Sequence, residues 1–167
     1  MVDDRKPTCG SFQHRWEQLL ADEPQRGRAA LQEAYRHASE AYPDECCGFI
    51  LASGQVHRAV NNQDVLHAED PIRWPRSARD AYSLAPADLY RLGLSFLGAD
   101  PAIIVYHSHP DVGAYFSEKD AADALYEGKP IYDVDYLVVD VRQTLPKGAK
   151  LFRFLDSAFT CVWSEEL

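Results

Sequence analysis

Two histidines in the stretch Tyr106-His107-Ser108-His109-Pro110 are the first sign of chemistry in this chain of 167 residues. They follow an apolar run, 102–106, that has the composition of a buried β-strand. Side chains alternate along a strand, so His107 and His109 point the same way and Ser108 points the other way. Two imidazoles side by side at a strand end make half of a tetrahedral zinc site. The pattern therefore predicts a metal site at this point of the chain.

An acidic residue one short loop later is a candidate for the third ligand. Ser117 and Asp120 open a segment of good helix formers, Glu118–Glu127, which Gly128 and Pro130 end. The plain interpretation is that Ser117 caps this helix and that Asp120 completes a capping box. The same helix start can instead aim Asp120 at the metal and leave Ser117 facing an open coordination position. Three protein ligands with one open position are typical of a catalytic zinc, whereas a structural zinc is closed by four.

A metal-dependent hydrolase also needs a carboxylate that accepts a proton from water, and Glu45 is the candidate. It lies in the stretch Tyr42–Phe49, where a helix gives way to an apolar strand. A side chain at such a strand entry can reach the end of a neighbouring strand. We therefore expect Glu45 beside the two histidines.

These residues together resemble the signature of the JAMM/MPN-type zinc metalloproteases. The signature consists of Glu45, then His107-Ser108-His109-Pro110, six further residues, Ser117, two residues and Asp120. The resemblance extends from about Ala29 to the C-terminus. It implies an α/β fold with a mixed, mostly antiparallel sheet flanked by helices, the cytidine-deaminase-like sandwich. It also implies Zn²⁺ held by the two histidines and Asp120, with Glu45 and Ser117 in catalytic roles.

The stretch Tyr106–Asp120, and Ala114-Tyr115-Phe116-Ser117 above all, is most similar to stand-alone prokaryotic members that process ubiquitin-like proteins. Those members cleave after the C-terminal Gly-Gly of β-grasp proteins, several of which are sulfur carriers. The resemblance thus implies a zinc-dependent peptidase or isopeptidase whose partner is such a protein. We expect its tail to lie extended along a sheet edge. Phe116 stands where many relatives have proline, which predicts a less rigid loop.

The expected mechanism follows from the charges of the ligands. Zinc held by two neutral imidazoles and one carboxylate keeps a positive charge and lowers the pKa of its water toward ~7. Glu45 would take the proton of that water and pass it to the leaving amine. The Ser117 hydroxyl would donate to the oxyanion, which is worth about 2–4 kcal/mol of the barrier.

The sequence disfavours three other functions. A non-catalytic MPN-type scaffold or interaction module has the same fold, but such members typically lack the metal ligands. A zinc nucleobase deaminase carries a His-x-Glu and Pro-Cys-x-x-Cys pattern, which this chain lacks. A DNA-repair-like protein with a related motif is disfavoured by the formal net charge of −9, because phosphates require a basic face.

A long stretch of irregular composition, Asn61–Arg79, precedes the metal motif. A loop of this length is either a functional flap or a variable surface loop. It contains Arg73, Arg76 and Arg79 in an otherwise acidic chain. We expect these arginines to bind the carboxylate of a short peptide extension after the cleaved bond.

Composition is ordinary for a globular domain, with 46% hydrophobic and 26% charged residues. No apolar run approaches the ~20 residues of a membrane span, and the N-terminus lacks the apolar core of a signal peptide. The expected location is cytoplasmic, without a membrane or nucleic-acid partner. The four cysteines form no Cys-x-x-Cys pair, so Cys46 and Cys47 are expected to act as small apolar residues. The oligomeric state stays open.

The remaining pattern predicts the order of the elements. Residues 1–27 form an N-terminal extension with a short amphipathic helix at Phe12–Ala21, and residues 28–167 form the metalloprotease-like domain. Periodicity and turn residues predict further helices at 29–41 and 86–98, strands at 46–52, 55–60, 81–84, 134–141, 150–155 and 159–163, and a turn at Gly148.

Overall fold

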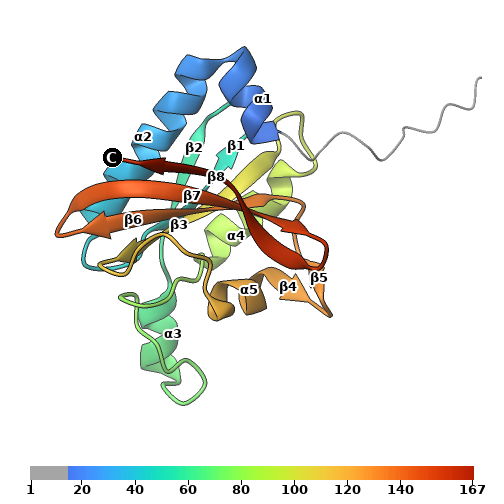
Figure 1. The fold of residues 1–167 in the computed structure, drawn as a ribbon. Coiled ribbons are helices and arrows are strands. Elements are labelled where there is room, and N and C mark those ends of the chain that lie inside the picture. Colours follow the sequence, from blue (N-terminus) through green and yellow to red (C-terminus); the bar gives the residue numbers. More distant parts are fainter. Residues whose placement is uncertain (1–14) are drawn as a thin grey trace, which may run out of the picture.

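A six-stranded sheet with helices on both faces forms the centre of the protein (Figure 1). The computed structural model describes residues 15–167, so the first residues of the predicted N-terminal helix lie outside the described part. The helices are α1 (Arg15–Asp22), α2 (Pro24–Ala41), α3 (Gln63–Glu69), α4 (Pro86–Ser95) and α5 (Glu118–Ala124). The strands are β1 (Cys47–Leu51), β2 (Val56–Ala59), β3 (Ala102–Pro110), β4 (Leu125–Tyr126), β5 (Lys129–Pro130), β6 (Asp135–Arg142), β7 (Leu145–Leu155) and β8 (Ala158–Glu166).

The strand order in the large sheet is β2-β1-β3-β6-β7-β8. Only β3 and β6 run parallel, and the other neighbouring strands pair antiparallel. The predicted mixed, mostly antiparallel sheet with flanking helices is therefore confirmed. The metal motif lies on β3, in the interior of the sheet, with β1 on one side and β6 on the other.

The two faces of the sheet belong to two separate hydrophobic clusters. Ile104 and Tyr106 of β3 pack with α1 and α2, whereas Val105 packs with Leu92 of α4. Alternation along the strand then places His107 on the α4 face, together with Val105. Figure 1 shows α1 and α2 above the sheet and α4 and α5 below it. The sequence pattern thus decides which side of the sheet carries the histidines.

A glycine lets β1 pack closely beside β3. A Cβ atom on Gly48 would lie 2.6 Å from the ring of Tyr106 and 2.3 Å from the His57 carbonyl oxygen, so no other residue fits without displacement. The Tyr106 hydroxyl in turn pairs with Nδ1 of His37 on α2 at 2.8 Å. These contacts fix β1, and with it the chain at Glu45, next to the metal motif.

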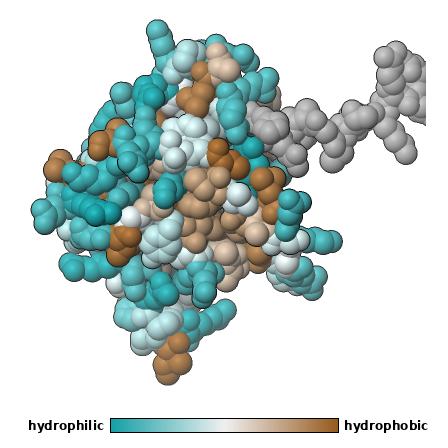
Figure 2. Space-filling view, viewed as in Figure 1, coloured by the Kyte–Doolittle hydropathy of each residue, from teal (hydrophilic) through white to brown (hydrophobic). Residues whose placement is uncertain are grey.

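The segment predicted as irregular contains a helix instead. Residues 63–69 form α3. This helix belongs to an arm, residues 61–84, that projects below the sheet (Figure 1). Figure 2 shows apolar surface at the tip of this arm, and Ile72 is 93% exposed. Residues 81–84 do not form the predicted strand; Leu84 makes one isolated antiparallel pairing with Asn61.

Two boundaries on the C-terminal side also differ from the prediction. The helix after Ser117 ends at Ala124, and the residues predicted to continue it form the small β4–β5 hairpin. Gly148 does not turn the chain but lies inside β7. The turn is made earlier, by Gln143 and Thr144, whose φ angles are both positive.

The N-terminal helix packs on the body of the protein. Trp16 of α1 is 1% exposed, and its ring lies 6.0 Å from that of Trp163 on β8. The following helix, α2, runs without a break from Pro24 through the predicted boundary between residues 27 and 28. Within residues 15–167, no helix is long and apolar enough to cross a membrane.

Candidate metal centre

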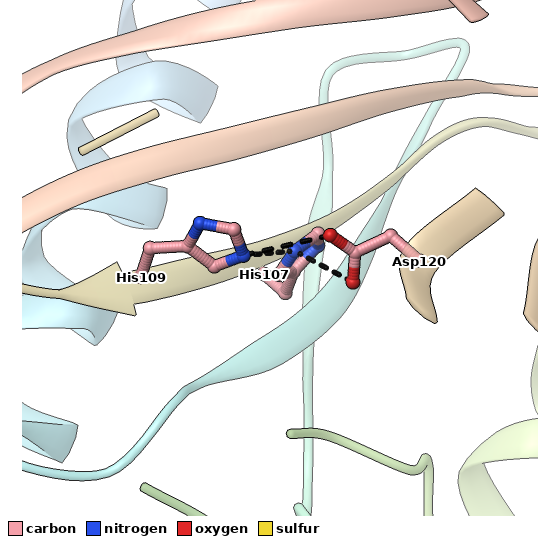
Figure 3. A group of neighbouring side chains, drawn as sticks. All are labelled: His107, His109 and Asp120. Atoms are coloured by element: carbon pink, nitrogen blue, oxygen red, sulfur yellow. Dashed lines mark hydrogen bonds and ion pairs between the residues drawn. The ribbon is translucent and has the colours of Figure 1, made fainter. Parts of the chain in front are cut away.

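The end of β3 and the start of α5 bring three ligand-type side chains together (Figure 3). The Nε2 atoms of His107 and His109 lie 3.1 Å apart. The Asp120 carboxylate faces both, with Oδ1 3.4 Å from His107 Nε2 and Oδ2 3.5 Å from His109 Nε2. All three side chains are buried. Within residues 15–167, this is the one group of three or more such side chains that could hold a metal ion.

The spacing of the two imidazole nitrogens and the Asp120 carboxylate fits a small tetrahedral cation. Ligand atoms at ~2.0–2.1 Å from a zinc ion lie roughly 3.3 Å from one another. The two imidazole nitrogens lie 3.1 Å apart, and each lies 3.4 or 3.5 Å from one of the two Asp120 oxygens, so the distances scatter about that value. Two imidazoles and one carboxylate are also a donor set that zinc accepts, and they leave a fourth position for another ligand. The residues present therefore fit the metal that the sequence predicts.

Asp120 is aimed by the cap of its own helix. Its N–H donates to the Ser117 Oγ at 3.0 Å, and its Oδ2 accepts from the N–H and the hydroxyl of Ser117 at 2.8 and 2.7 Å. Both interpretations of this pair thus hold together: the residues form a capping box, and the box turns the carboxylate toward the histidines. The Ser117 hydroxyl contacts Asp120 rather than a free position, and its side chain also lines the pocket in front of the ligands.

The two imidazoles are oriented differently. Nδ1 of His109 lies 3.1 Å from the Gly113 carbonyl oxygen, which favours a proton on Nδ1 and leaves Nε2 as the ligand atom. His107 is held by packing, because the Tyr82 ring stacks on it with centroids 4.4 Å apart. Nδ1 of His107 is buried without a hydrogen-bond partner among the described residues. Burial lowers the pKa of His107 and outweighs the opposing charge of Asp120, which favours the neutral, ligating form.

Glu45 reaches the same pocket from the segment just before β1. It lines a pocket of about 130 Å³ together with His109, Ser117 and Asp120. The side chain is buried, and burial together with the charge of Asp120 raises its pKa to about 8. For Asp120, burial also acts to raise the pKa, but the histidines and Ser117 outweigh it and hold that pKa well below its usual range. The two carboxylates therefore differ: Asp120 stays ionised, and Glu45 can hold or release a proton near neutral pH.

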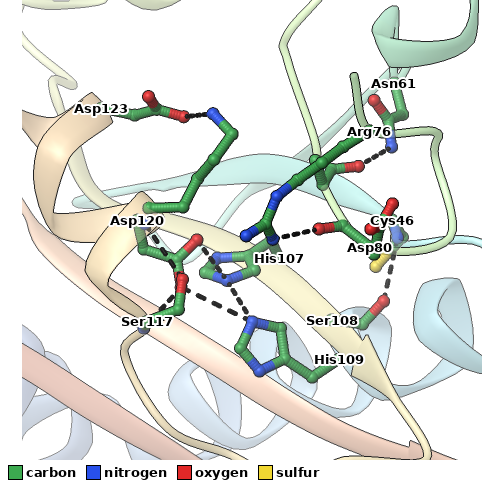
Figure 4. Close-up of polar contacts among 12 residues, drawn as sticks. Cys46, Asn61, Arg76, Asp80, His107, Ser108, His109, Ser117, Asp120 and Asp123 are labelled. Carbon is green, nitrogen blue, oxygen red and sulfur yellow. Dashed lines mark hydrogen bonds and ion pairs between the residues drawn. The ribbon is translucent and has the colours of Figure 1, made fainter. Parts of the chain in front are cut away.

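The backbone at Glu45 is fixed from two directions. Its N–H donates to the Ala78 carbonyl at 2.7 Å. The neighbouring Cys46 N–H donates to Oγ of Ser108 at 2.9 Å, and the Ser108 N–H returns a bond to the Cys46 carbonyl at 3.1 Å (Figure 4). Ser108 thus points away from the two histidines, as alternation predicts, and connects β3 to the segment that carries Glu45, just before β1.

Asn61 is a positioning residue that sequence reasoning missed. Its Nδ2 donates to the carbonyls of Glu45 and Ala81 at 3.0 and 3.1 Å. Its Oδ1 accepts from the N–H groups of Gln63 and Ser83 at 3.0 and 3.1 Å. One side chain thus connects the segment before β1, the start of α3 and residues 81–83. The only signal in the sequence was an asparagine at the start of a loop, which is too common to single out.

The three arginines of the arm do not share one place. Arg76 and Arg79 line the metal pocket, and Arg76 donates to the Asp80 carbonyl at 3.1 Å (Figure 4). Arg79 lies 4.0 Å from the carboxylate of Asp44. Arg73 instead lies over the Trp74 ring, 5.5 Å from its centroid. The structure therefore brings two of the three to the candidate site.

Phe116, which stands where many relatives have proline, is anchored by aromatic packing. Its ring lies 4.5 Å from Phe159, 5.2 Å from Tyr136 and 5.5 Å from Phe152, measured between centroids. Contacts of this kind restrict the loop in a different way from the fixed φ of proline. The residue directly before Ser117 is thereby tied to three strands of the sheet.

Fold and site together define a protein of the JAMM/MPN class: a mixed sheet carries paired histidines on an inner strand, and an aspartate on the next helix faces them. Comparison with known families agrees. Residues 27–146 match the family of prokaryotic homologs of the JAB domain, and the chain belongs to that family.

Two solved structures share the fold. A protein from Salinibacter ruber is 24% identical, with a TM-score of 0.50, over 80% of this chain and 84% of that one. A Desulfitobacterium hafniense protein is 18% identical, with a TM-score of 0.53, over 83% of this chain and 87% of that one. A search of curated proteins found no match.

Proposed function

We propose that this protein is a zinc-dependent peptidase or isopeptidase that cleaves after the C-terminal Gly-Gly of a β-grasp, ubiquitin-like or sulfur-carrier protein. The observation that carries the proposal is the convergence of His107, His109 and Asp120, whose nitrogen and carboxylate oxygen atoms lie 3.1–3.5 Å apart. His109 and Asp120 line one pocket with the buried Glu45. Membership of the JAB family supports the hydrolytic class. The substrate rests on the resemblance of residues 106–120 to stand-alone prokaryotic members.

The residues divide the reaction between them. When bound, a zinc ion supplies a Lewis acid that acidifies water and polarises a carbonyl. Glu45 takes the proton of the attacking water and returns it to the leaving amine. A carboxyl group whose pKa is raised to about 8 suits both tasks, since it binds and releases protons near neutral pH. Asp120, whose pKa is held low, keeps its charge and stays a ligand.

Ser117 is proposed as the donor to the oxygen of the attacked carbonyl. It lines the pocket, and its hydroxyl donates to Asp120 Oδ2, with the two oxygens 2.7 Å apart. Rotation of the hydroxyl proton toward the substrate leaves intact the bond that Ser117 Oγ accepts from the Asp120 N–H, so the cap survives. A donor of this kind is worth about 2–4 kcal/mol of the barrier.

A narrow pocket supports glycine at the cleaved bond. The metal pocket has a volume of about 130 Å³ and is lined by large side chains such as Tyr82 and Tyr115. A side chain on the residue next to the metal would compete with them for space. Glycine leaves room for the backbone to approach the ligands.

Metal analysis and a cleavage assay test the proposal together. The purified chain should contain one zinc ion per molecule and should cleave a β-grasp protein that carries extra residues after Gly-Gly. Glu45→Gln should keep the metal and lose cleavage, whereas Glu69→Gln, an exposed carboxylate at the end of α3, should keep both. Metal binding without cleavage of any such substrate would favour the alternative, a non-catalytic MPN-type scaffold or interaction module.

A narrower proposal concerns the leaving peptide. Arg76 and Arg79 line the metal pocket and are exposed, so they are placed to bind the carboxylate of a short extension after Gly-Gly. Alanine at both positions should slow the cleavage of a free-ended extension more than that of its amidated form. Arg73→Ala serves as the comparison, because Arg73 lies on Trp74. Equal losses on the two substrates would reject this role.

A further inference from the structure

A second, more apolar cavity opens beside the metal pocket. It has a volume of about 260 Å³, and Trp74, Leu84, Leu89, Leu92, Val105 and Tyr132 are among the residues that line it. Tyr82, Lys119 and Asp123 line both this cavity and the metal pocket, so the two hollows share a wall. That wall includes the Tyr82 ring, which stacks on His107. The cavity therefore lies next to the reacting centre.

The floor of this cavity is the hydrophobic core itself. Leu92 and Val105 are 1% and 3% exposed and belong to the cluster between the sheet and α4. At the rim, Leu89 is 44% exposed. Apolar concave surface with a few polar groups at its mouth is typical of a ligand site. Here the polar groups include the ion pair of Lys119 and Asp123, 2.6 Å apart.

The size of the cavity indicates what it takes. A cavity of roughly 150 Å³ lined by apolar side chains accommodates benzene. A volume of about 260 Å³ therefore has room for one aromatic or branched aliphatic side chain, but not for a folded domain.

The register along β3 sets the distance between this side chain and the cleaved bond. Val105 on the cavity floor lies two residues before His107 and on the same face of the strand. Two residues of strand span roughly 6.6 Å. Both edges of β3 are paired, so a substrate must pass over this face of the sheet instead of adding to β3 as a strand. An extended peptide that runs over the face covers the same distance in two residues. The side chain in the cavity therefore belongs to the second residue away from the one at the metal.

The positions of the two arginines indicate in which direction the substrate chain runs through the site. Arg76 and Arg79 line the metal pocket but not the apolar cavity, so a leaving peptide held by them lies on the other side of the ligands. The apolar cavity then receives the part of the substrate that precedes the cleaved bond.

We infer that the apolar cavity is a specificity site for a large apolar side chain on the residue directly before the substrate's Gly-Gly. This inference rests on the proposed cleavage after Gly-Gly and adds a sequence requirement to it. Carrier proteins with an aromatic or branched residue at that position bind productively, and those with a small or charged residue there bind poorly.

Binding of two short peptides tests the inference. The zinc-loaded full chain is titrated with N-acetylated Phe-Gly-Gly and Ala-Gly-Gly peptides by calorimetry. The phenylalanine peptide should bind at least ~10-fold more tightly, because an apolar pocket discriminates by 10–200-fold for even small differences in the side chain that fills it. Equal affinities would overturn the inference.

A matched pair of variants on α4 locates the effect. Leu89→Trp should fill the cavity and abolish the preference for phenylalanine. Leu94→Trp changes the same residue type on the same helix, at 46% instead of 44% exposure, but lies outside the cavity and should keep the preference. Loss of the preference in both variants, or in neither, would contradict the assignment.

The binding assay separates this inference from the proposed function. Preference for phenylalanine without cleavage of any extended substrate would support the apolar specificity site and reject the proposed peptidase activity. Cleavage at a rate that does not depend on the residue before Gly-Gly would support the peptidase activity and reject the apolar specificity site.

Discussion

Replacing Glu45 with glutamine is expected to stabilise the metal-free protein, by an amount that grows as the pH rises. The folded protein keeps the Glu45 proton up to a pKa of about 8, because the side chain is buried and faces the charge of Asp120. An unfolded chain loses this proton near the ordinary value of 4.5. Between these values the unfolded state binds fewer protons, so the free energy of unfolding of the wild type falls with rising pH. Glutamine has no proton to lose and avoids this fall.

The structure also limits the size of the effect. Each pH unit within this window removes about 1.4 kcal/mol from the free energy of unfolding of the wild type. The whole window therefore allows a difference of at most about 5 kcal/mol, and relaxation of water around the carboxylate reduces it to on the order of 2 kcal/mol. Below pH 4.5 both states of the wild type are protonated and the two proteins should differ little from this source.

Urea unfolding in the presence of a chelator, at pH 5.0, 6.5 and 8.5, measures the difference directly. The advantage of Glu45→Gln over the wild type should increase at each step. Glu69→Gln removes an exposed carboxylate of α3 and should show no such trend. Two results would refute the argument that Glu45 is buried with a raised pKa. One is a constant difference in the free energy of unfolding across the three pH values, and the other is a difference that shrinks as the pH rises.

Three further substitutions probe the site and its support. Asp120→Asn should weaken zinc binding by more than the roughly 10–100-fold that follows the loss of an outer partner, as measured by competition with a chromophoric chelator. Ser108→Ala leaves the buried Cys46 N–H without its partner and should reduce the free energy of unfolding by about 1–3 kcal/mol in urea. Phe116→Ala should cost about 2–3 kcal/mol of stability and also weaken zinc binding, because the ring anchors the loop that leads to Asp120. Phe154→Ala, whose ring has one aromatic neighbour in that cluster, should reduce stability less and leave zinc affinity unchanged.

The convergence of the three candidate ligands could be predicted because it depends on local rules. Alternation along one strand puts His107 and His109 on one face, and a capping box four residues long aims Asp120. Neither rule requires knowledge of the rest of the fold. Glu45 is different, since its position depends on β1 pairing beside β3, and the sequence pattern could only suggest that pairing.

The errors fall where a residue type has two uses. Glycine marks both turns and places where two backbones approach closely, and Gly148 is of the second kind: a Cβ there would lie 2.1 Å from the Glu165 carbonyl oxygen. The turn falls instead on Gln143 and Thr144, which carry no turn signal as strong as glycine. The helix α3 was missed because it is short, and its surroundings are rich in Asn, Asp and Pro.

The candidate metal ligands and the proposed base, Glu45, are held in place by different contacts, so one can change without the other. The ligands lie on β3 and α5, and their geometry is set by strand alternation and by Ser117. Glu45 lies in the segment just before β1 and is held by contacts at its backbone, from Ala78, from Asn61 and, through Cys46, from Ser108. A change in those contacts can move the carboxylate without moving a ligand. Such a protein would bind metal with normal affinity and lack a correctly placed base, so in this chain metal content alone is a weak indicator of hydrolytic competence.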